Sequence, residues 1–137
     1  MSNTIDTIVI GAGRLGSNIA RQLSRQEDVL LVDISKDELS QVTDFTGFME
    51  VGDATDLSFL EENGVRNLKR IVIITEDDNT NIFLADVCYH IFGLKEIYIR
   101  LKDSRKMKLV DSSVKCICPF DLSLEDFEIQ MQKEVAR

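Results

Sequence analysis

The stretch that most constrains the fold of this chain is a glycine-rich turn close to the N-terminus. An apolar segment, Thr7–Ile10, leads into a turn that reads Gly11, Ala12, Gly13, Arg14, Leu15 and Gly16. In this Gly-x-Gly-x-x-Gly pattern the first glycine permits a sharp turn, the second lets the backbone approach a pyrophosphate, and the third lets helix and strand pack closely. The N–H groups at the start of the helix then face an anion. The pattern predicts a strand–turn–helix unit that binds a nucleotide.

A second apolar run supports this interpretation. The segment Val29–Val32 ends on Asp33, seventeen residues after Gly16, close to the spacing of about 20 residues that is typical of such sites. An acid at the tip of the second strand can accept hydrogen bonds from ribose hydroxyls, and it disfavours a 2'-phosphate. We therefore expect NAD(H), ATP, ADP or AMP rather than NADP, and we include Ile34 in the predicted site. The alternative is a surface acid at a strand tip.

Short apolar segments alternate with helical patterns along the whole chain. Strands are expected at Thr7–Ile10, Val29–Val32, Phe48–Val51, Arg70–Ile74, Glu96–Leu101 and Val114–Cys118. This alternation predicts an α/β fold, a Rossmann-like doubly wound parallel sheet. Right-handed crossovers and the glycine turn favour the strand order 3-2-1-4-5-6. We expect residues 1–122 to form this nucleotide-binding domain.

A last helix is expected from Ser123, after Pro119–Asp121 interrupt the sixth strand. Its apolar residues recur at helical spacing and are Leu124, Phe127, Met131 and Val135. The sequence offers no later strand for this stripe, so the helix either folds back or crosses to a neighbouring molecule. We predict a C-terminal crossover and dimerisation helix over residues 123–137. The expected helix Asp78–Phe92 is apolar nearly all round, which also favours a homodimer.

In this topology the ligand lies at the carboxyl ends of the first and fourth strands. After the third strand we place Asp53, Ala54 and Thr55 in the site, with main-chain groups available to an adenine; a turn with a helix cap is the alternative. After the fourth strand we place Thr75, Glu76, Asp78 and Asn81, which we expect to line ribose and phosphates rather than to form a metal or acid–base site. Arg14 either reaches phosphate oxygens or is a solvated side chain.

Charge and composition exclude several classes of partner. The net charge of -8 argues against nucleic acid and against an anionic membrane surface. No apolar run approaches the roughly 18 residues of a membrane span, and Met1–Asp6 is polar, without a signal-peptide core. The three cysteines fit a reducing compartment, and we expect structural roles for them. We therefore expect a cytoplasmic protein that reaches a membrane only through a partner.

The sequence shows no catalytic machinery that would turn the nucleotide site into an enzyme. We find no nucleophile–base pair, no paired carboxylates at a reacting centre and no P-loop lysine, so we predict no catalytic residue. We also expect no substrate domain, which a dehydrogenase of this type requires. Two alternatives stay open: the cofactor-binding half of an NAD-dependent oxidoreductase, and the sensor domain of a cation antiporter.

The motifs together resemble the N-terminal nucleotide-binding domain of regulator-of-potassium-conductance proteins. These are the RCK or KTN domains (TrkA-N) of Trk- and Ktr-type potassium uptake systems. The resemblance covers about Ile5 to Ala136, and its most specific part is Gly-Arg-x-Gly in the turn combined with Gly-Asp-Ala-Thr at residues 52–55. Asp33 and the segment from Thr75 through Asp78 to Asn81 complete it.

This resemblance implies a cytosolic gating subunit, peripheral to the inner membrane, that binds NAD(H) or ATP/ADP. It implies dimers that assemble into a ring beneath an integral-membrane potassium transporter. The implied roles are phosphate binding for Arg14, ribose binding for Asp33, and adenine binding for Asp53 and Ala54. Some members bind a divalent cation near the start of the last helix; Glu125 is the candidate here, with helix-start electrostatics as the alternative. Members usually continue into a second ligand-binding domain, so this sequence is either an excised piece or a short form.

Overall fold

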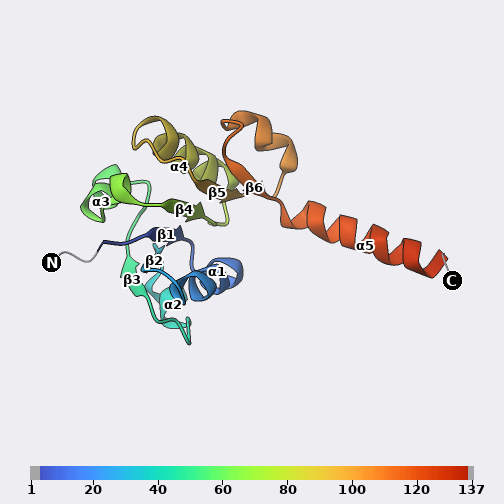
Figure 1. Cartoon of the computed structure of the whole chain (residues 1–137), viewed down its shortest axis with the longest axis horizontal. Coiled ribbons are helices and arrows are strands. Elements are labelled where there is room, and N and C mark those ends of the chain that lie inside the picture. The colour runs from blue at the N-terminus through green and yellow to red at the C-terminus, as the bar shows by residue number, and fades with distance from the viewer. Residues whose placement is uncertain (1–3, 136–137) are drawn as a thin grey trace.

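The strands of the structure form one parallel sheet in the order predicted from the sequence. The structure, a computed structural model, describes residues 4–135. Within that range six strands are present: β1 Thr7–Ile10, β2 Val29–Asp33, β3 Phe48–Val51, β4 Arg70–Ile73, β5 Ile97–Arg100 and β6 Lys115–Ile117. Their order is β3-β2-β1-β4-β5-β6 with every neighbouring pair parallel (Figure 1). The predicted Rossmann-like fold is confirmed.

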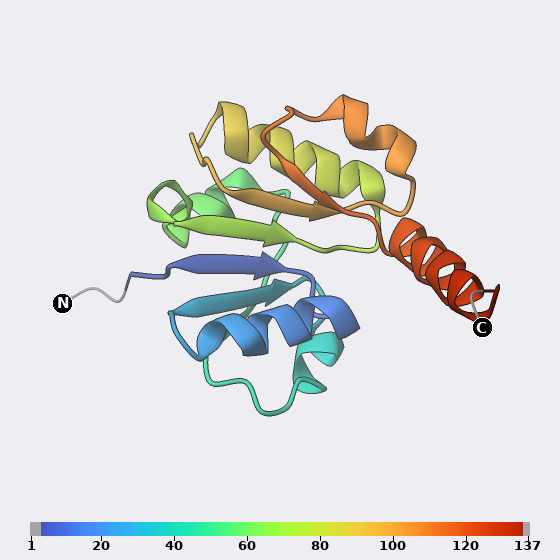
Figure 2. The same ribbon diagram turned by 45° about the vertical axis from the view of Figure 1, so that its right-hand side comes forward.

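Helices cover both faces of this sheet (Figure 2). The α-helices are α1 Arg14–Ser24, α2 Lys36–Ser40, α3 Leu57–Glu62, α4 Asp78–His90 and α5 Pro119–Val135, with 3₁₀ helices at Val65–Asn67 and Ser104–Leu109. Side chains of α1 and α2 pack on one face, and those of α3 and α4 on the other. This layering follows from parallel strands, because each return to the next strand must cross a face of the sheet.

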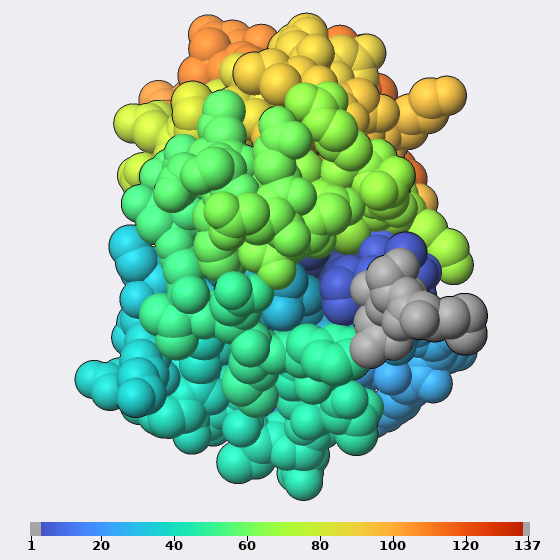
Figure 3. Space-filling view, turned by 90° about the vertical axis from the view of Figure 1, so that its left-hand side faces the viewer, coloured from blue at the N-terminus to red at the C-terminus, as the bar shows by residue number. Residues whose placement is uncertain are grey.

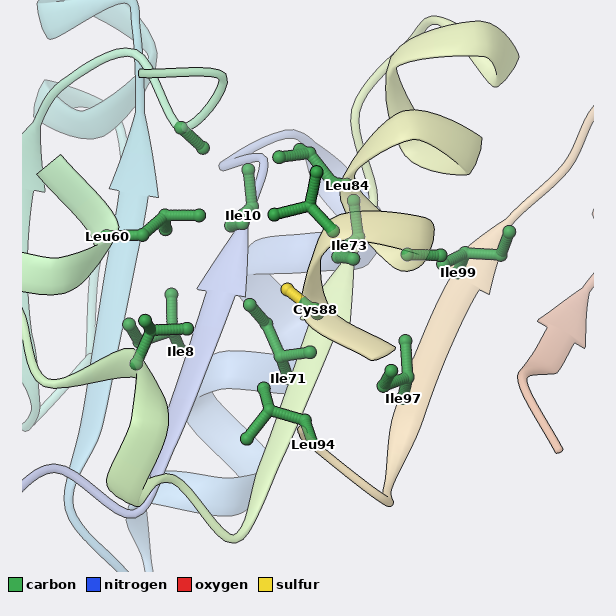
Figure 4. Packing of buried hydrophobic residues seen from close by; sticks show 14 of the residues in the cluster. Ile8, Ile10, Leu60, Ile71, Ile73, Leu84, Cys88, Leu94, Ile97 and Ile99 are labelled. Carbon is green, nitrogen blue, oxygen red and sulfur yellow. The ribbon is translucent and has the colours of Figure 1, made fainter. Parts of the chain in front are cut away.

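The core is divided between the two faces by the alternation of side chains along each strand. Ile8 and Ile10 of β1 point toward α3 and α4, together with isoleucines of β4 and β5 (Figure 4). Val9, between them, packs on the opposite face under α1. All three are nearly or completely buried. A central strand that is covered on both sides needs such a continuous apolar sequence, which is why the apolar runs identified the strands.

A cluster of charges stabilises the amino end of the sheet, the end that faces the viewer in Figure 3. The guanidinium of Arg70 pairs with Glu27 and, at 2.7 Å from its Nε, with Oε2 of Glu96. These hydrogen bonds raise the pKa of Arg70, and the bond from Arg70 lowers the pKa of Glu96. Thr7 Oγ1 joins the cluster through Glu27 at 2.6 Å. These ion pairs therefore have a structural role, at the opposite end of the strands from the predicted site.

The last helix begins earlier than the sequence predicted. The structure starts α5 at Pro119 rather than Ser123, and the N–H of Leu122 already donates to the carbonyl of Cys118 at 3.1 Å. Proline is well suited to a first helical position, where its missing N–H would have no partner. The predicted boundary after residue 122 therefore falls inside α5, and the division into two units remains a prediction. Residues 136 and 137 of the predicted helix lie outside the described part.

The helix α5 projects away from the sheet (Figures 1 and 2). From Phe120 to Val135 every residue is exposed. Phe83 of α4 is also exposed, as is Ile91 directly after the last residue of this helix, whereas most other apolar residues of α4 are in the core. Between residues 4 and 135, no helix has both the length and the hydrophobicity to cross a lipid bilayer.

Candidate functional site

A cavity of about 430 Å³ lies at the carboxyl ends of the strands, a size typical of small-ligand sites. Four segments line it: the glycine turn, the end of β2 with α2, the turn after β3, and the loop after β4 with α4. Nine of the predicted site residues line this cavity: Gly11, Gly13, Asp33, Ile34, Asp53, Ala54, Thr55, Thr75 and Glu76. The structure thus brings together the segments that the sequence placed at this edge.

The three glycines of the turn differ in what surrounds them. Gly11 has a φ of +110°, and a Cβ added to it would lie 2.3 Å from the carbonyl oxygen of Ile74. A Cβ on Gly16 would lie 1.8 Å from the carbonyl oxygen of Gly11. A Cβ on Gly13 would meet no atom closer than Oε1 of Glu76, at 4.0 Å. The first and third glycines therefore allow close packing, whereas Gly13 faces open space in the cavity wall.

Asp33 connects the second strand to the glycine turn. Its Oδ2 accepts a hydrogen bond from the N–H of Ala12 at 2.7 Å, and its Oδ1 accepts one from the N–H of Ser35 at 2.8 Å. Ser35 in turn caps α2, where its side chain accepts from the N–H of Glu38. Each carboxylate oxygen can accept two hydrogen bonds. Asp33 therefore holds the turn and still has acceptor capacity directed at the cavity.

In the turn after β3, the carboxylate of Asp53 is hydrogen-bonded within the turn itself. Oδ1 of Asp53 accepts from the hydroxyl of Thr55 at 2.6 Å and from its N–H at 2.9 Å. These hydrogen bonds, the one from the hydroxyl first, lower the pKa of Asp53. Ala54 is buried against the core. The Asp53 carboxylate thus closes its own turn, and the Asp53 carbonyl accepts from the N–H of Asp56 at 3.0 Å. A contact between an adenine and the main chain of Asp53 and Ala54 remains a prediction.

Two predicted residues after β4 hold the loop that lines the cavity in place but do not line the cavity themselves. Asn81 is fully buried; its amide donates to the carbonyls of Thr75 at 3.1 Å and Arg100 at 2.8 Å. The carboxylate of Asp78 accepts from the N–H groups of Lys102 at 2.8 Å and Asp103 at 3.0 Å. Neither residue lines the cavity. They fix the loop after β4 to the end of β5, and a direct contact with a ligand remains a prediction.

The remaining predicted residues belong to the turn and the first turn of α1. Ala12, Arg14, Leu15 and Gly16 do not line the cavity. The side chain of Arg14 is exposed, and its carbonyl accepts from the amide of Asn18 at 2.6 Å. Helix geometry leaves the first N–H groups of α1 without intrahelical partners, and anions are attracted there. The phosphate contact of Arg14 remains a prediction.

Four cavity residues were not predicted: Ile10, Ile74 and Leu84, which contribute apolar surface, and Glu38. Gly52, Asp77 and Thr80 complete the lining and belong to the segments after β3 and β4 that the sequence placed at this edge. Ile10 ends β1, so its position at a strand tip was a usable signal. Thr80 and Leu84 lie one helical turn apart and therefore share a face of α4. Glu38 comes from α2, whose approach to the cavity depends on tertiary packing.

The charge of the cavity is negative. Five carboxylates line it, those of Asp33, Glu38, Asp53, Glu76 and Asp77, and no lysine or arginine is among the described lining residues. In residues 4–135, no three His, Cys, Asp or Glu side chains are grouped as metal ligands. Glu125 lies on the exposed α5, so a cation there remains a prediction. Positive charge for a ligand phosphate would therefore have to come from backbone N–H groups and from cations outside this lining.

Comparison with known proteins identifies relatives. The family model described as TrkA-N domain matches residues 7–115. The "Trk system potassium uptake protein TrkA homolog" of Pyrococcus horikoshii is 26% identical over 124 residues, which are 89% of this chain and 54% of that protein. The chain thus spans about half the length of the curated relatives it matches.

Two solved structures share the fold. The TrkA-N domain of the inner membrane protein ybaL from Escherichia coli has a TM-score of 0.78 at 10% identity, covering 94% of this chain and 98% of that chain. The Shewanella denitrificans Kef CTD, solved in an AMP-bound form, has a TM-score of 0.76 at 24% identity, covering 96% and 82%. The family match covers most of the sequence and the sheet order agrees with it, so this chain belongs to the TrkA-N domain family.

Proposed function

We propose that this chain binds NAD(H) or an adenine nucleotide and serves as a regulatory, gating unit of a potassium uptake system. The observation that carries the proposal is the cavity in which the glycine turn, Asp33 and the turn after β3 converge. The phosphates would lie over Gly13 and the start of α1, and the ribose hydroxyls would bind Asp33. The adenine would lie against the main chain of Asp53 and Ala54.

Two relatives support the ligand and the biological process. The P. horikoshii relative is named as a potassium uptake protein, and the Kef domain that shares the fold was solved with AMP. We therefore propose a cytoplasmic regulator that meets an integral-membrane potassium transporter. A ligand can move such a gate only if it binds two states of the domain with different affinities. We propose no catalytic role, because the polar side chains of the cavity are carboxylates and threonines, most of them engaged in turns, caps or ion pairs, with no nucleophile–base pair among them.

The exposed helix α5 supports a homodimer within a larger ring. Its large apolar side chains are between 42% and 81% exposed, and they are Phe120, Leu122, Leu124, Phe127, Ile129, Met131 and Val135. Five of them, Phe120, Leu124, Phe127, Met131 and Val135, recur at helical spacing and share one face of α5. An exposed apolar stripe of this kind marks an interaction site. We propose that α5 crosses to a second copy of the chain and covers this surface there.

Thermal unfolding with and without ligand tests the proposal. NAD, NADH, ATP, ADP and AMP are each added well above their dissociation constants, and guanosine monophosphate serves as the control for the base. A bound ligand at 100 times its dissociation constant stabilises the folded state by about 2.7 kcal/mol. We expect a rise in midpoint with at least one adenine ligand. No rise with any of the five would contradict the proposal, and protein-dependent oxidation of NADH would favour the oxidoreductase alternative.

A further inference from the structure

The side chain of Glu76 lies opposite the phosphate position of the proposed site. Among the described residues, and apart from the two chain neighbours of Gly13, its Oε1 is the one atom within 4 Å of a Cβ built on Gly13, at 4.0 Å. Gly13 is the residue at which this type of turn lets a pyrophosphate approach the backbone. A phosphate over Gly13 and the Glu76 carboxylate would therefore compete for nearly the same space, and both are negatively charged.

Two cations hold the carboxylate in this position. Nη2 of Arg100 lies 3.2 Å from Oε1 of Glu76, and Nζ of Lys102 lies 3.3 Å from Oε2. The hydrogen bond from Lys102, followed by that from Arg100, lowers the pKa of Glu76. The carboxylate therefore stays ionised, and it is the group that neutralises these two cations at the rim of the cavity.

The two partners Arg100 and Glu76 differ in exposure and in their other contacts. The Arg100 side chain is only 15% exposed, its Nη2 also donates to the carbonyl of Thr75 at 2.7 Å, and its buried Nε has no hydrogen-bond partner within the described residues. The Glu76 side chain is 81% exposed. An approaching anion can thus push Glu76 into solvent, whereas Arg100 stays in place.

We propose that Glu76 is a specificity-determining residue that occupies the place of a ligand phosphate. In the free protein it binds Arg100 and Lys102; a phosphate over Gly13 displaces it and takes over these cations. This inference rests on the nucleotide site proposed above. Because every ligand with a phosphate over Gly13 must displace Glu76, the residue weakens binding most for the ligands with the most phosphate charge, and it shifts selectivity from ATP toward AMP.

Titration calorimetry with adenosine, AMP, ADP and ATP tests the inference on the wild type and on Glu76→Gln. The glutamine has nearly the same shape but no charge. We expect Glu76→Gln to tighten ATP binding about tenfold, AMP binding about threefold and adenosine binding not at all, the range expected for one partly exposed charge facing a multivalent anion. An unchanged ratio of ATP to AMP affinity overturns the inference.

Two further variants test whether the effect is specific to Glu76 or follows from the loss of any negative charge in the cavity. Glu38→Gln removes another carboxylate from the same cavity, from α2, and should change the ATP-to-AMP ratio less than twofold, because no rim cation is released. Lys102→Met in the Glu76→Gln background should reverse most of the gain for ATP. An equal effect of Glu38→Gln, or no effect of Lys102→Met, contradicts the displacement mechanism. If the wild type binds none of the nucleotides, the proposed function itself fails.

Discussion

The carboxylate of Asp33 accepts a hydrogen bond from the backbone N–H of Ala12, with 2.7 Å between Oδ2 and N. This bond joins the tip of β2 to the glycine turn that follows β1, across two adjacent parallel strands. The acid that the sequence assigned to ribose therefore also has a structural task. It fixes the turn in the conformation in which Gly13 faces the cavity, so loss of the carboxylate affects both the ligand and the loop that receives it.

Substitution of Asp33 should therefore reduce both stability and nucleotide affinity. Asp33→Ala leaves the N–H groups of Ala12 and Ser35 without their acceptor, and we expect a loss of about 1–2 kcal/mol in the free energy of unfolding. Affinity for every ribose-containing ligand should fall at least tenfold, the effect of about 1.4 kcal/mol of lost hydrogen bonding. Urea unfolding and calorimetry measure the two effects. Unchanged affinity would remove Asp33 from the site.

The glycines of the turn provide a matched pair of alanine variants. Gly16→Ala places a methyl group 1.8 Å from the carbonyl oxygen of Gly11, which the backbone can relieve only by separating α1 from the turn. We expect a loss of more than about 3 kcal/mol. Gly13→Ala meets nothing within 4.0 Å except Glu76 and should cost at most about 1 kcal/mol, the penalty of alanine at an N-cap.

We expect Gly13→Ala to lose nucleotide binding and Gly16→Ala to lose stability. Gly13→Ala should remain folded, as judged by circular dichroism, and should lose nucleotide binding because its methyl group occupies the phosphate position. Gly16→Ala should show the lower unfolding midpoint before any ligand is added. Tight nucleotide binding by Gly13→Ala would show that the phosphates do not lie over this residue.

The central strands were predictable because β1, β2 and β4 are covered on both faces and so require an apolar run. The strand order followed from right-handed crossovers and the glycine turn. The end of the sheet that carries the site followed from the same topology. What the spacing of residues could not provide was the direction of each side chain in the loop after β4. Glu76 points to the rim of the cavity, whereas Asp78, two residues later, turns inward to the backbone of Lys102 and Asp103.

The start of α5 was missed because the sequence signals at that point conflict. Pro119 ends β6, which the sequence indicated, but proline is equally suited to begin a helix. Ser123 provided a second plausible start, and the choice depends on the backbone direction that β6 leaves at Cys118. Glu38 and Leu84 were missed as cavity residues for a related reason, since each depends on how its helix packs on the sheet.

The ion-pair cluster of Arg70 predicts a difference in the free energy of unfolding between the wild type and Arg70→Met that depends on pH. Arg70→Met leaves Glu27 and Glu96 without their cation, and because these side chains are 11% and 35% exposed, we expect a loss of about 2 kcal/mol at pH 7. The pKa of Glu96 is lowered in the folded state by Arg70. Its contribution to stability is therefore present above the usual glutamate pKa of about 4.3 and is lost as the pH falls through the lowered value.

Urea unfolding between pH 7 and pH 3 measures this difference, because carboxylates outside the Arg70 cluster contribute equally to the wild type and to Arg70→Met. The gap in the free energy of unfolding between wild type and Arg70→Met should narrow below about pH 4. A difference in the free energy of unfolding that stays constant down to pH 3 contradicts a stabilising ion pair between Arg70 and Glu96. Lys69→Met is the control, since Lys69 is 63% exposed and lies 3.9 Å from Asp6; we expect a loss of less than about 0.5 kcal/mol.

The exposed stripe of α5 predicts how oligomerisation responds to charge. Phe127 is 60% exposed and lies at the centre of the stripe formed with Leu124 and Met131. Phe127→Asp should convert the proposed dimer to a monomer, because a carboxylate in an apolar interface loses its hydration without gaining a partner. Gln132→Asp introduces the same charge more than a third of a turn away on the helix, and it should remain dimeric. Light scattering at micromolar concentration measures both masses. A wild type that is monomeric there, or a Phe127→Asp variant that stays dimeric, would show that α5 does not form the contact between subunits.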